Sequence, residues 1–232
     1  VPRGSSITLN ANIPLNSTTS TYSWSTTTYD WNVSTSWLNI MPIPNTYNSA
    51  TGQYVAGIPG TNPVTVLSAF LGDRLICRNG SLPVGFAANN AGAPNRPYTL
   101  FAVNLNASVG SVGSILWMNT VDPPPGNVSL SYGGADPTAW NGNGRGVFIF
   151  GVEETINWIG FSLTTGQQIW GPTIPQHQWD YYGNPIYPYI TGQVANGFLY
   201  STGFSGITYA YDLTTGKVVW TYGNDPSNPK NS

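Results

Sequence analysis

Hydrophobic and polar residues alternate in two similar stretches near the end of the chain. The first stretch, Ile159–Trp170, reads IGFSLTTGQQIW, and the second, Tyr209–Trp220, reads YAYDLTTGKVVW. Such alternation predicts β-strands that bury one face. The Thr-Gly pair between the strands supplies the positive φ angle that a short hairpin requires, and glycine adopts it without steric cost. Each stretch therefore predicts a β-hairpin that ends in a tryptophan.

The similarity extends upstream of both hairpins. An apolar strand precedes each one, so that Val147 and Trp170 are 23 residues apart and Phe198 and Trp220 are 22 residues apart. A third copy has strands near Leu75 and at 98–105, and it ends at Trp117. Its longer span of 42 residues reflects two longer loops, at 79–97 and 106–113. Self-similarity at a period of 40 to 50 residues predicts a repeat architecture.

A fourth copy is less regular. It is expected around residues 28–32, where Trp24 and Trp31 are rival closing residues. Residues 51–55 repeat the Thr-Gly turn, although no tryptophan follows it. The N-terminal third is therefore the part of the chain in which the repeat is hardest to place.

An all-β fold follows from this pattern. The chain contains 19 prolines and 27 glycines, which interrupt it too often for long helices, and no stretch has a clear amphipathic helical period. One small sheet cannot bury both faces, whereas several sheets around an axis can. A closing tryptophan offers about 150–250 Å² of surface to wedge between neighbouring sheets. The residues expected to have these structural roles are Trp117, Gly166, Trp170, Asp212, Gly216 and Trp220.

The stretch from Gly197 to Trp220 resembles the blade repeat of pyrroloquinoline quinone (PQQ)-like β-propellers, and the whole chain resembles archaeal cell-surface proteins with such repeats. The resemblance implies W-shaped, four-stranded blades with a tryptophan docked between blades. Propellers of this family commonly have seven or eight blades, and about four units fit here. The chain is therefore expected to be an excised part of a larger propeller, unless a strand at 6–13 closes a smaller ring.

The expected organisation follows the repeat. Residues 1–6, VPRGSS, match what a thrombin-cleavage tag leaves behind and are excluded from the fold. The remaining segments are an uncertain blade at 7–36, a blade with expanded loops at 37–124, blades at 125–175 and 176–223, and a tail at 224–232.

Composition favours an extracellular or cell-surface location. Charged residues make up 7% of the chain, against about 25% in an average soluble domain. Attached glycans would supply the hydration that charges do not. Five Asn-x-Ser/Thr sites are candidates for glycosylation: Asn16, Asn32, Asn79, Asn106 and Asn127.

Several classes of protein are disfavoured. The basic residues are scattered, whereas nucleic-acid binding needs a clustered basic surface. No apolar run reaches the roughly 18 residues of a membrane-spanning helix. Cys77 and His177 are the only residues of their types, so neither an intrachain disulfide nor a Cys/His metal cluster can form. Cys77 is expected to be a buried, inert thiol.

Catalytic candidates are weak, and no catalytic, cofactor or metal residue is assigned. Quinoprotein dehydrogenases of the resembled family use PQQ, Ca²⁺ and a general-base aspartate, and they often have a vicinal disulfide that one cysteine cannot form. Glu153 and Glu154 are the only adjacent acids, and neighbouring residues of a strand point to opposite faces. Asp212 is expected to stabilise a turn.

The loop 179–189 is the best candidate for binding a sugar or a protein partner. Its aromatic side chains could stack on sugar rings or contact a protein, although they could also simply cover the edge of a blade. They are Trp179, Tyr181, Tyr182, Tyr187 and Tyr189. The expected function is a non-catalytic envelope scaffold or interaction module, with protein or glycan partners and the remaining blades of a parent protein. The alternatives are a fragment of a PQQ-dependent dehydrogenase and a glycan-binding propeller.

Overall fold

The computed structural model describes residues 41, 43–48, 50–57, 64–84, 95–137, 144–176, 192–202 and 206–223. Several expectations lie outside these ranges: the tag at 1–6, the blade at 7–36 with Asn16 and Asn32, the strand at 6–13, His177, the tail at 224–232, and the aromatic loop with Trp179, Tyr181, Tyr182, Tyr187 and Tyr189.

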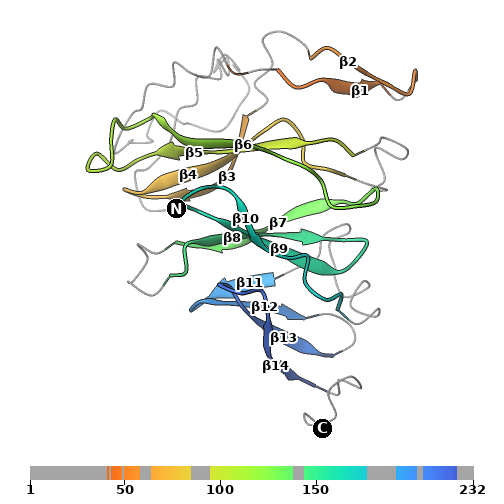
Figure 1. Ribbon diagram of the computed structural model, residues 1–232, viewed down its shortest axis with the longest axis vertical. Helices are drawn as coiled ribbons and strands as arrows, with labels where there is room; N and C mark the ends of the chain where they lie inside the picture. The colour runs from red at the N-terminus through yellow and green to blue at the C-terminus, as the bar shows by residue number, and fades with distance from the viewer. Residues whose placement is uncertain are drawn as a thin grey trace, which may run out of the picture.

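The described residues form three four-stranded antiparallel sheets and a small hairpin (Figure 1). The hairpin consists of β1 (Thr46–Asn48) and β2 (Gln53–Val55). The first sheet contains β3 (Val64–Phe70), β4 (Arg74–Asn79), β5 (Tyr98–Asn104) and β6 (Ile115–Val121). The second contains β7 (Leu130–Asp136), β8 (Val147–Val152), β9 (Asn157–Ser162) and β10 (Gln168–Trp170). The third contains β11 (Gly192–Ala195), β12 (Phe198–Thr202), β13 (Thr208–Asp212) and β14 (Val218–Tyr222).

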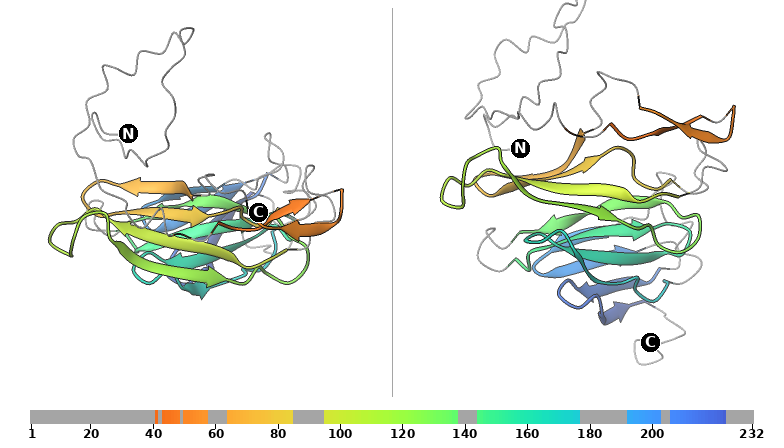
Figure 2. Two further views of the ribbon diagram at one scale, coloured as in Figure 1. Left: turned by 90° about the horizontal axis from the view of Figure 1, so that it is seen from above. Right: turned by 45° about the horizontal axis from the view of Figure 1, so that its top comes forward.

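Each four-stranded sheet is a meander, because its strands are hydrogen-bonded in chain order. The three sheets lie one above another, and the second sheet separates the first from the third (Figures 1 and 2). Their first strands are neighbours, since β7 contacts both β3 and β11. Four-stranded meanders with adjacent first strands are the blades of a β-propeller. The prediction of an all-β fold built from such blades is confirmed.

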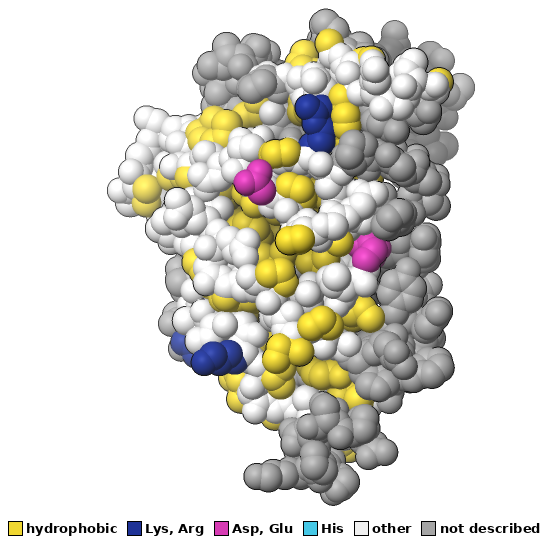
Figure 3. Space-filling view, turned by 45° about the vertical axis from the view of Figure 1, so that its right-hand side comes forward, with side chains coloured by type: hydrophobic (Ala, Val, Ile, Leu, Met, Phe, Trp, Pro, Cys, Tyr) yellow, Lys and Arg dark blue, Asp and Glu magenta, His cyan; other side chains and the backbone are white. Residues whose placement is uncertain are grey.

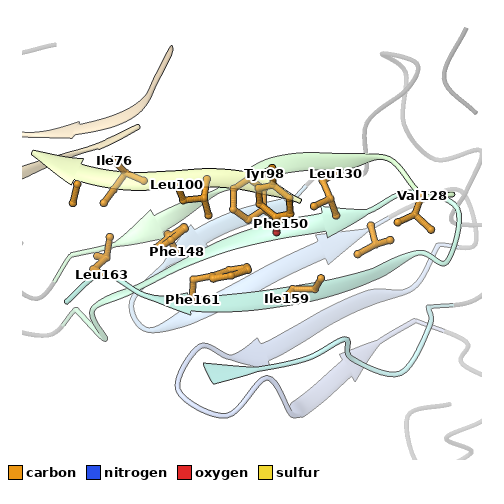
Figure 4. Packing of buried hydrophobic residues seen from close by; sticks show 12 residues of the cluster. Ile76, Tyr98, Leu100, Val128, Leu130, Phe148, Phe150, Ile159, Phe161 and Leu163 are labelled. Carbon is orange, nitrogen blue, oxygen red and sulfur yellow. The ribbon is translucent and has the colours of Figure 1, made fainter. Parts of the chain in front are cut away.

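The core lies between the sheets. Apolar side chains of the first and second sheets form one cluster (Figure 4). The ring of Phe148 stacks on the rings of Trp117 and Phe161, with ring centroids 6.1 and 5.3 Å apart. A second cluster joins the second and third sheets, with Ile149 and Trp158 on one side and Leu199, Tyr209 and Tyr211 on the other. A third lies on the opposite face of the first sheet and includes Met41, Cys77 and Leu105.

One turn geometry recurs along the chain. In the third sheet, Asp212 accepts hydrogen bonds from the backbone N–H of Gly216 through its carbonyl, and from Thr214 and Thr215 through its side chain. Gly216 has a φ of 68°. The β1–β2 hairpin repeats this pattern, with Asn48 as the acceptor and Gly52 at 67°. The Thr-Gly echo at 51–55 therefore forms the same turn as its better-defined relatives.

The first sheet contains an enlarged version of this turn. Gly113 donates to the carbonyl of Asn104 at 2.8 Å, and Gly166 donates to the carbonyl of Ser162 at the same distance. Eight residues separate Asn104 from Gly113, whereas three separate Ser162 from Gly166, so the turn of the first sheet carries an insertion of five residues. The hydrogen bond that closes the hairpin is kept.

Candidate functional site

The tryptophan that ends the first sheet contacts the turn of the second sheet. The indole N–H of Trp117 donates to the carbonyl oxygen of Leu163 at 2.9 Å. Arg74 donates to the same oxygen at 2.6 Å. Gly166 lies against the indole so closely that an added Cβ would be 2.3 Å from its ring carbons. We call this contact between a closing tryptophan and the turn of the next sheet a joint. It needs a carbonyl oxygen that can accept the indole hydrogen bond and a glycine beside the ring.

The second and third sheets are joined by the equivalent tryptophan, leucine and glycine. The indole N–H of Trp170 donates to the carbonyl oxygen of Leu213 at 2.7 Å. A Cβ on Gly216 would lie 2.5 Å from the indole, and one on Gly160, beneath the ring, would lie 2.1 Å from it. Trp170 is only 9% exposed as a result.

Trp220 occupies the equivalent position in the third sheet. It pairs with Ala210 in the strand register, as Trp170 pairs with Gly160 and Trp117 with Ala102. However, Trp220 is 43% exposed. The described residues thus contain two occupied joints and one open one.

The acidic side chains with known contacts stabilise local structure. Asp73 forms an ion pair with Arg74 at 3.0 Å, and Asp136 accepts a hydrogen bond from the backbone N–H of Arg145. Glu154 accepts hydrogen bonds from both the backbone N–H and the hydroxyl group of Ser129. Asp212 holds its turn, as described above.

A Ca²⁺-quinone site does not fit the described residues. Such a site needs converging carboxylate and amide oxygens, and across the described ranges no three His, Cys, Asp or Glu residues are grouped to hold a metal ion. The carboxylates of Asp73, Glu154 and Asp212 are already engaged elsewhere in the fold. No reaction step is therefore assigned through quinone or calcium.

A pocket of about 540 Å³ opens beside the first strands of the sheets. Its polar lining includes Thr65, Arg78, Ser131 and Gln193, and Tyr132 adds an aromatic ring. The Arg78 side chain donates to the carbonyl of Gly80. Burial lowers the pKa of this guanidinium below its ordinary value.

Two hydroxyl groups beside this pocket differ in their contacts. The hydroxyl of Tyr132 is hydrogen-bonded to that of Ser68 at 2.7 Å, which links β7 to β3. The hydroxyl of Ser131 is buried and has no hydrogen-bond partner among the described residues. Arg78, Ser131 and Gln193 come from three different sheets, so no local pattern in the sequence indicated this pocket.

The glycosylation candidates differ in exposure. Asn79, at the end of β4, is only 7% exposed, so a glycan there would require its side chain to reach solvent. Asn106 lies in the enlarged turn of the first sheet, and Asn127 precedes β7; both are partly exposed. Use of any of these sites stays a prediction.

Cys77 is fully buried on the face of the first sheet that packs against Met41. Burial raises the pKa of its thiol from 9.0 to about 12. A thiol that does not ionise at neutral pH is a poor nucleophile, which agrees with the expected inert role.

The sequence located the closing tryptophans but not their acceptors. Leu163 and Leu213 contribute backbone carbonyl oxygens, which side-chain patterns do not single out. One signal was present, because both leucines immediately precede Thr-Thr-Gly in the two most similar stretches. Because a leucine side chain is not chemically reactive, its presence at the same position of both stretches indicates a role for the backbone or for packing there.

Comparisons with known proteins add only a distant structural likeness. No protein-family model matches the chain. No curated protein matches it either. In the part of the chain that the structure describes, no helical segment has the length and hydrophobicity needed to span a bilayer.

The similar solved structures include three proteins. BamB from Moraxella catarrhalis is 15% identical, with a TM-score of 0.35, over 65% of this chain and 34% of BamB. The quinohemoprotein alcohol dehydrogenase ADHIIG from Pseudomonas putida HK5 is 16% identical, with a TM-score of 0.34, over 76% of this chain and 31% of the enzyme. The computationally designed Ika8 protein is 14% identical, with a TM-score of 0.35, over 77% of this chain and 42% of the design. The chain spans about a third of the length of BamB and of the dehydrogenase.

Proposed function

We propose that this protein is a non-catalytic, extracellular β-propeller module that serves as a cell-envelope scaffold or protein-interaction surface. The observation that carries the proposal is the use of its polar groups. Two indole N–H groups join neighbouring sheets, and the carboxylates of Glu154 and Asp212 hold loops and turns. Chemistry of this kind stabilises a scaffold, and it leaves these groups unavailable to a substrate.

The surface supports the extracellular part of the proposal. Few charged side chains are visible on the face in Figure 3, where hydrophobic and uncharged polar groups dominate. Partly exposed Asn106 and Asn127 offer places for hydrating glycans. The partners of such a module would be proteins or glycans at the cell surface, together with further blades of a longer parent protein.

Two measurements test the proposed function. Protease treatment of intact cells of the native host should remove the protein from the surface, whereas cytoplasmic markers stay intact. Purified protein supplied with PQQ, Ca²⁺ and an alcohol should show no turnover above buffer. Turnover that depends on the quinone would contradict the proposal. Absorbance from bound quinone that a longer parent protein reconstitutes, but this chain does not, would instead support the alternative of a PQQ-dependent dehydrogenase fragment.

A glycan-binding function is the second candidate, and the pocket favours it. A volume of about 540 Å³ falls in the usual range of small-molecule sites, about 300–1,000 Å³. Arg78, Ser131 and Gln193 offer donors and acceptors for sugar hydroxyls, and Tyr132 offers an aromatic ring. Gln193 also follows closely after the aromatic loop in the chain.

A glycan array tests this second candidate. Two variants are compared: one carries Arg78→Gln, and the other carries Tyr181→Ala and Tyr182→Ala together. Loss of glycan binding in both variants would support a site to which the pocket and the aromatic loop both contribute. A matched control is Lys217→Gln, which also removes one positive charge but lies outside the pocket. Equal binding by all of these variants would reject the site.

A further inference from the structure

The pocket beside the first strands of the sheets has an exposed polar rim and a buried floor. Thr65, Ser81 and Gln193 are exposed at the rim, whereas Leu130 and Ser131 of β7 are buried. Ser131 is only 8% exposed, and its hydroxyl has no hydrogen-bond partner among the described residues. A buried hydroxyl without a partner is unfavourable, and a ligand that bonds to it removes that cost. The floor therefore offers a hydrogen bond to a ligand in the pocket.

Arg78 adds a positive charge to the wall of the same pocket. It lies in β4, where it pairs with Thr65 of β3, and it is half-buried. One N–H group of its guanidinium donates to the carbonyl oxygen of Gly80. A guanidinium has several N–H donors in a planar fork, so others remain for a ligand. Within the described ranges Arg78 forms no ion pair, in contrast to Arg74, which is paired with Asp73.

The described part of the pocket provides no charge to balance this arginine. No aspartate or glutamate is among the described residues that line it. Burial lowers the pKa of the guanidinium, because the charged form is solvated less well there than in water. The phenol of Tyr132 is neutral at ordinary pH, since burial raises its pKa to about 12. A half-buried cation without a counter-charge favours an anionic ligand.

The neutral lining narrows the kind of anion. The planar fork of an arginine matches a carboxylate through two parallel hydrogen bonds. The ammonium group of an amino acid would meet no carboxylate among the described lining residues. In contrast, Thr65, Ser131 and Gln193 offer partners for hydroxyl groups. Tyr132 adds an aromatic ring, while its own hydroxyl is bonded to Ser68. This combination fits a sugar that carries a carboxylate.

We propose that the pocket binds a hexuronic acid residue of an acidic glycan, with the carboxylate on Arg78 and sugar hydroxyl groups on Ser131 and Gln193. The inference rests on the second candidate function, glycan binding, and deepens it by naming the charge of the sugar. The pocket then selects a sugar by its charge as well as by its shape.

NMR titrations of isotope-labelled protein test the proposal with matched sugars. The probes are methyl glucuronide and methyl galacturonide, each compared with its neutral methyl ester. Each acid should bind about tenfold or more tightly than its ester, because a hydrogen bond to a charged group is stronger than one to a neutral group. Binding of the acid should also shift the Nε–H signal of Arg78.

Variants of two arginines locate the carboxylate. Arg78→Gln should weaken binding of the acid about tenfold or more and change binding of the ester little. Arg78→Lys keeps the charge but loses the planar fork, so its affinity for the acid should lie between those of Arg78→Gln and the unaltered protein. Arg145→Gln is the matched control, because Arg145 lies beside Asp136, at the opposite end of β7 from Leu130. It should leave both affinities unchanged.

Ser131→Ala separates ligand binding from folding. It should lower the affinity for the acid about two- to tenfold, because one hydrogen bond to the sugar is lost. Its free energy of unfolding in a urea titration should not fall, because the hydroxyl has no partner among the described residues to lose. Lower stability with unchanged affinity would contradict the contact of Ser131 with the sugar.

Several results would overturn the proposal. An ester that binds as tightly as its acid would show that the pocket takes sugars without selecting their charge, so glycan binding would stand and this inference would fail. Cyclohexanecarboxylate that binds as tightly as the acids would make the occupant a carboxylate other than a sugar. Equal effects of Arg78→Gln and Arg145→Gln would place the acid elsewhere. No binding of any probe would reject this inference together with glycan binding in the pocket, whereas the scaffold function is tested separately by surface location and turnover.

Discussion

Gly216 provides the sharpest test of how the sheets are joined. We expect Gly216→Ala to destabilise the protein much more than Gly72→Ala, although both glycines have nearly the same φ, 68° and 70°. An alanine in this left-handed region costs about 1–2 kcal/mol at either position. A Cβ at Gly216 would also lie 2.5 Å from the ring of Trp170, whereas one at Gly72 would meet nothing within 4 Å.

The difference between the two variants measures the joint itself. Crowding in a packed interior costs about 1–3 kcal/mol, and a displaced indole would weaken a hydrogen bond worth about 1 kcal/mol. The free energy of unfolding should therefore fall by about 1–2 kcal/mol in Gly72→Ala and by about 2–5 kcal/mol in Gly216→Ala. Urea titrations followed by fluorescence and circular dichroism measure both values.

A double-mutant cycle supplies the control. In a Trp170→Ala background the extra cost of Gly216→Ala should disappear, because the ring that it meets is gone. Equal losses in the two glycine variants, or an extra cost that persists without the ring, would refute the contact of Gly216 with Trp170.

Three further predictions follow from burial and hydrogen bonding. Trp170→Ala should lower the free energy of unfolding by about 3–5 kcal/mol. Trp220→Ala should lower it by about half as much or less, because Trp220 is more exposed. Equal losses in urea titrations would contradict the difference between the occupied and open joints. Tyr132→Phe should cost about 0.5–1.5 kcal/mol by removing the hydrogen bond to Ser68, and Ser68→Ala in that background should add little in the same titration. Burial raises the thiol pKa of Cys77 from 9.0 to about 12. Between these pH values only the unfolded protein ionises the thiol, so the free energy of unfolding should stay constant below pH 9 and fall as the pH rises to 12, by up to about 1.4 kcal/mol per pH unit. Cys77→Ala should reduce this alkaline slope in unfolding measured at a series of pH values.

The sequence predicted the parts of the blades that its pattern repeats. Strands β8, β9, β12 and β13 coincide with alternating or apolar runs, and the Thr-Gly turns lie where glycine was required. Local chemistry decides these features, because a turn with positive φ or a strand with one buried face leaves its own residue pattern.

The first strand of each sheet was not located from the sequence. In β7, two glycines interrupt the hydrophobic pattern: a Cβ on Gly133 would lie 2.7 Å from the ring of Trp158, and one on Gly134 would lie 3.4 Å from Val194. Gly133 is fixed by Trp158 of the same sheet, and Gly134 has a φ of 119°, which favours glycine. Packing against another strand and backbone conformation therefore selected glycine where a local reading would favour a β-branched residue.

The candidate site was predictable only in part, for a related reason. The closing tryptophans stood out because their spacing recurs, whereas the pocket depends on side chains from three sheets. Likewise, the hydrogen bonds from Ser129 to Glu154 join residues that are 25 positions apart in the chain. The sequence therefore offers the adjacent acids Glu153 and Glu154 as possible catalytic residues, whereas in the structure Glu154 stabilises a loop through its hydrogen bonds to Ser129.

Exchange of the indole N–H protons is the most direct test of the central claim, that each sheet is joined to the next by a tryptophan. NMR spectra with assignments from single Trp→Phe variants resolve Trp117, Trp170 and Trp220. The indole protons bound to the carbonyls of Leu163 and Leu213 should exchange about tenfold or more slowly than that of Trp220, equivalent to about 1.4 kcal/mol. Exchange of Trp117 and Trp170 as fast as that of Trp220 would contradict the joints and the stack of blades built on them.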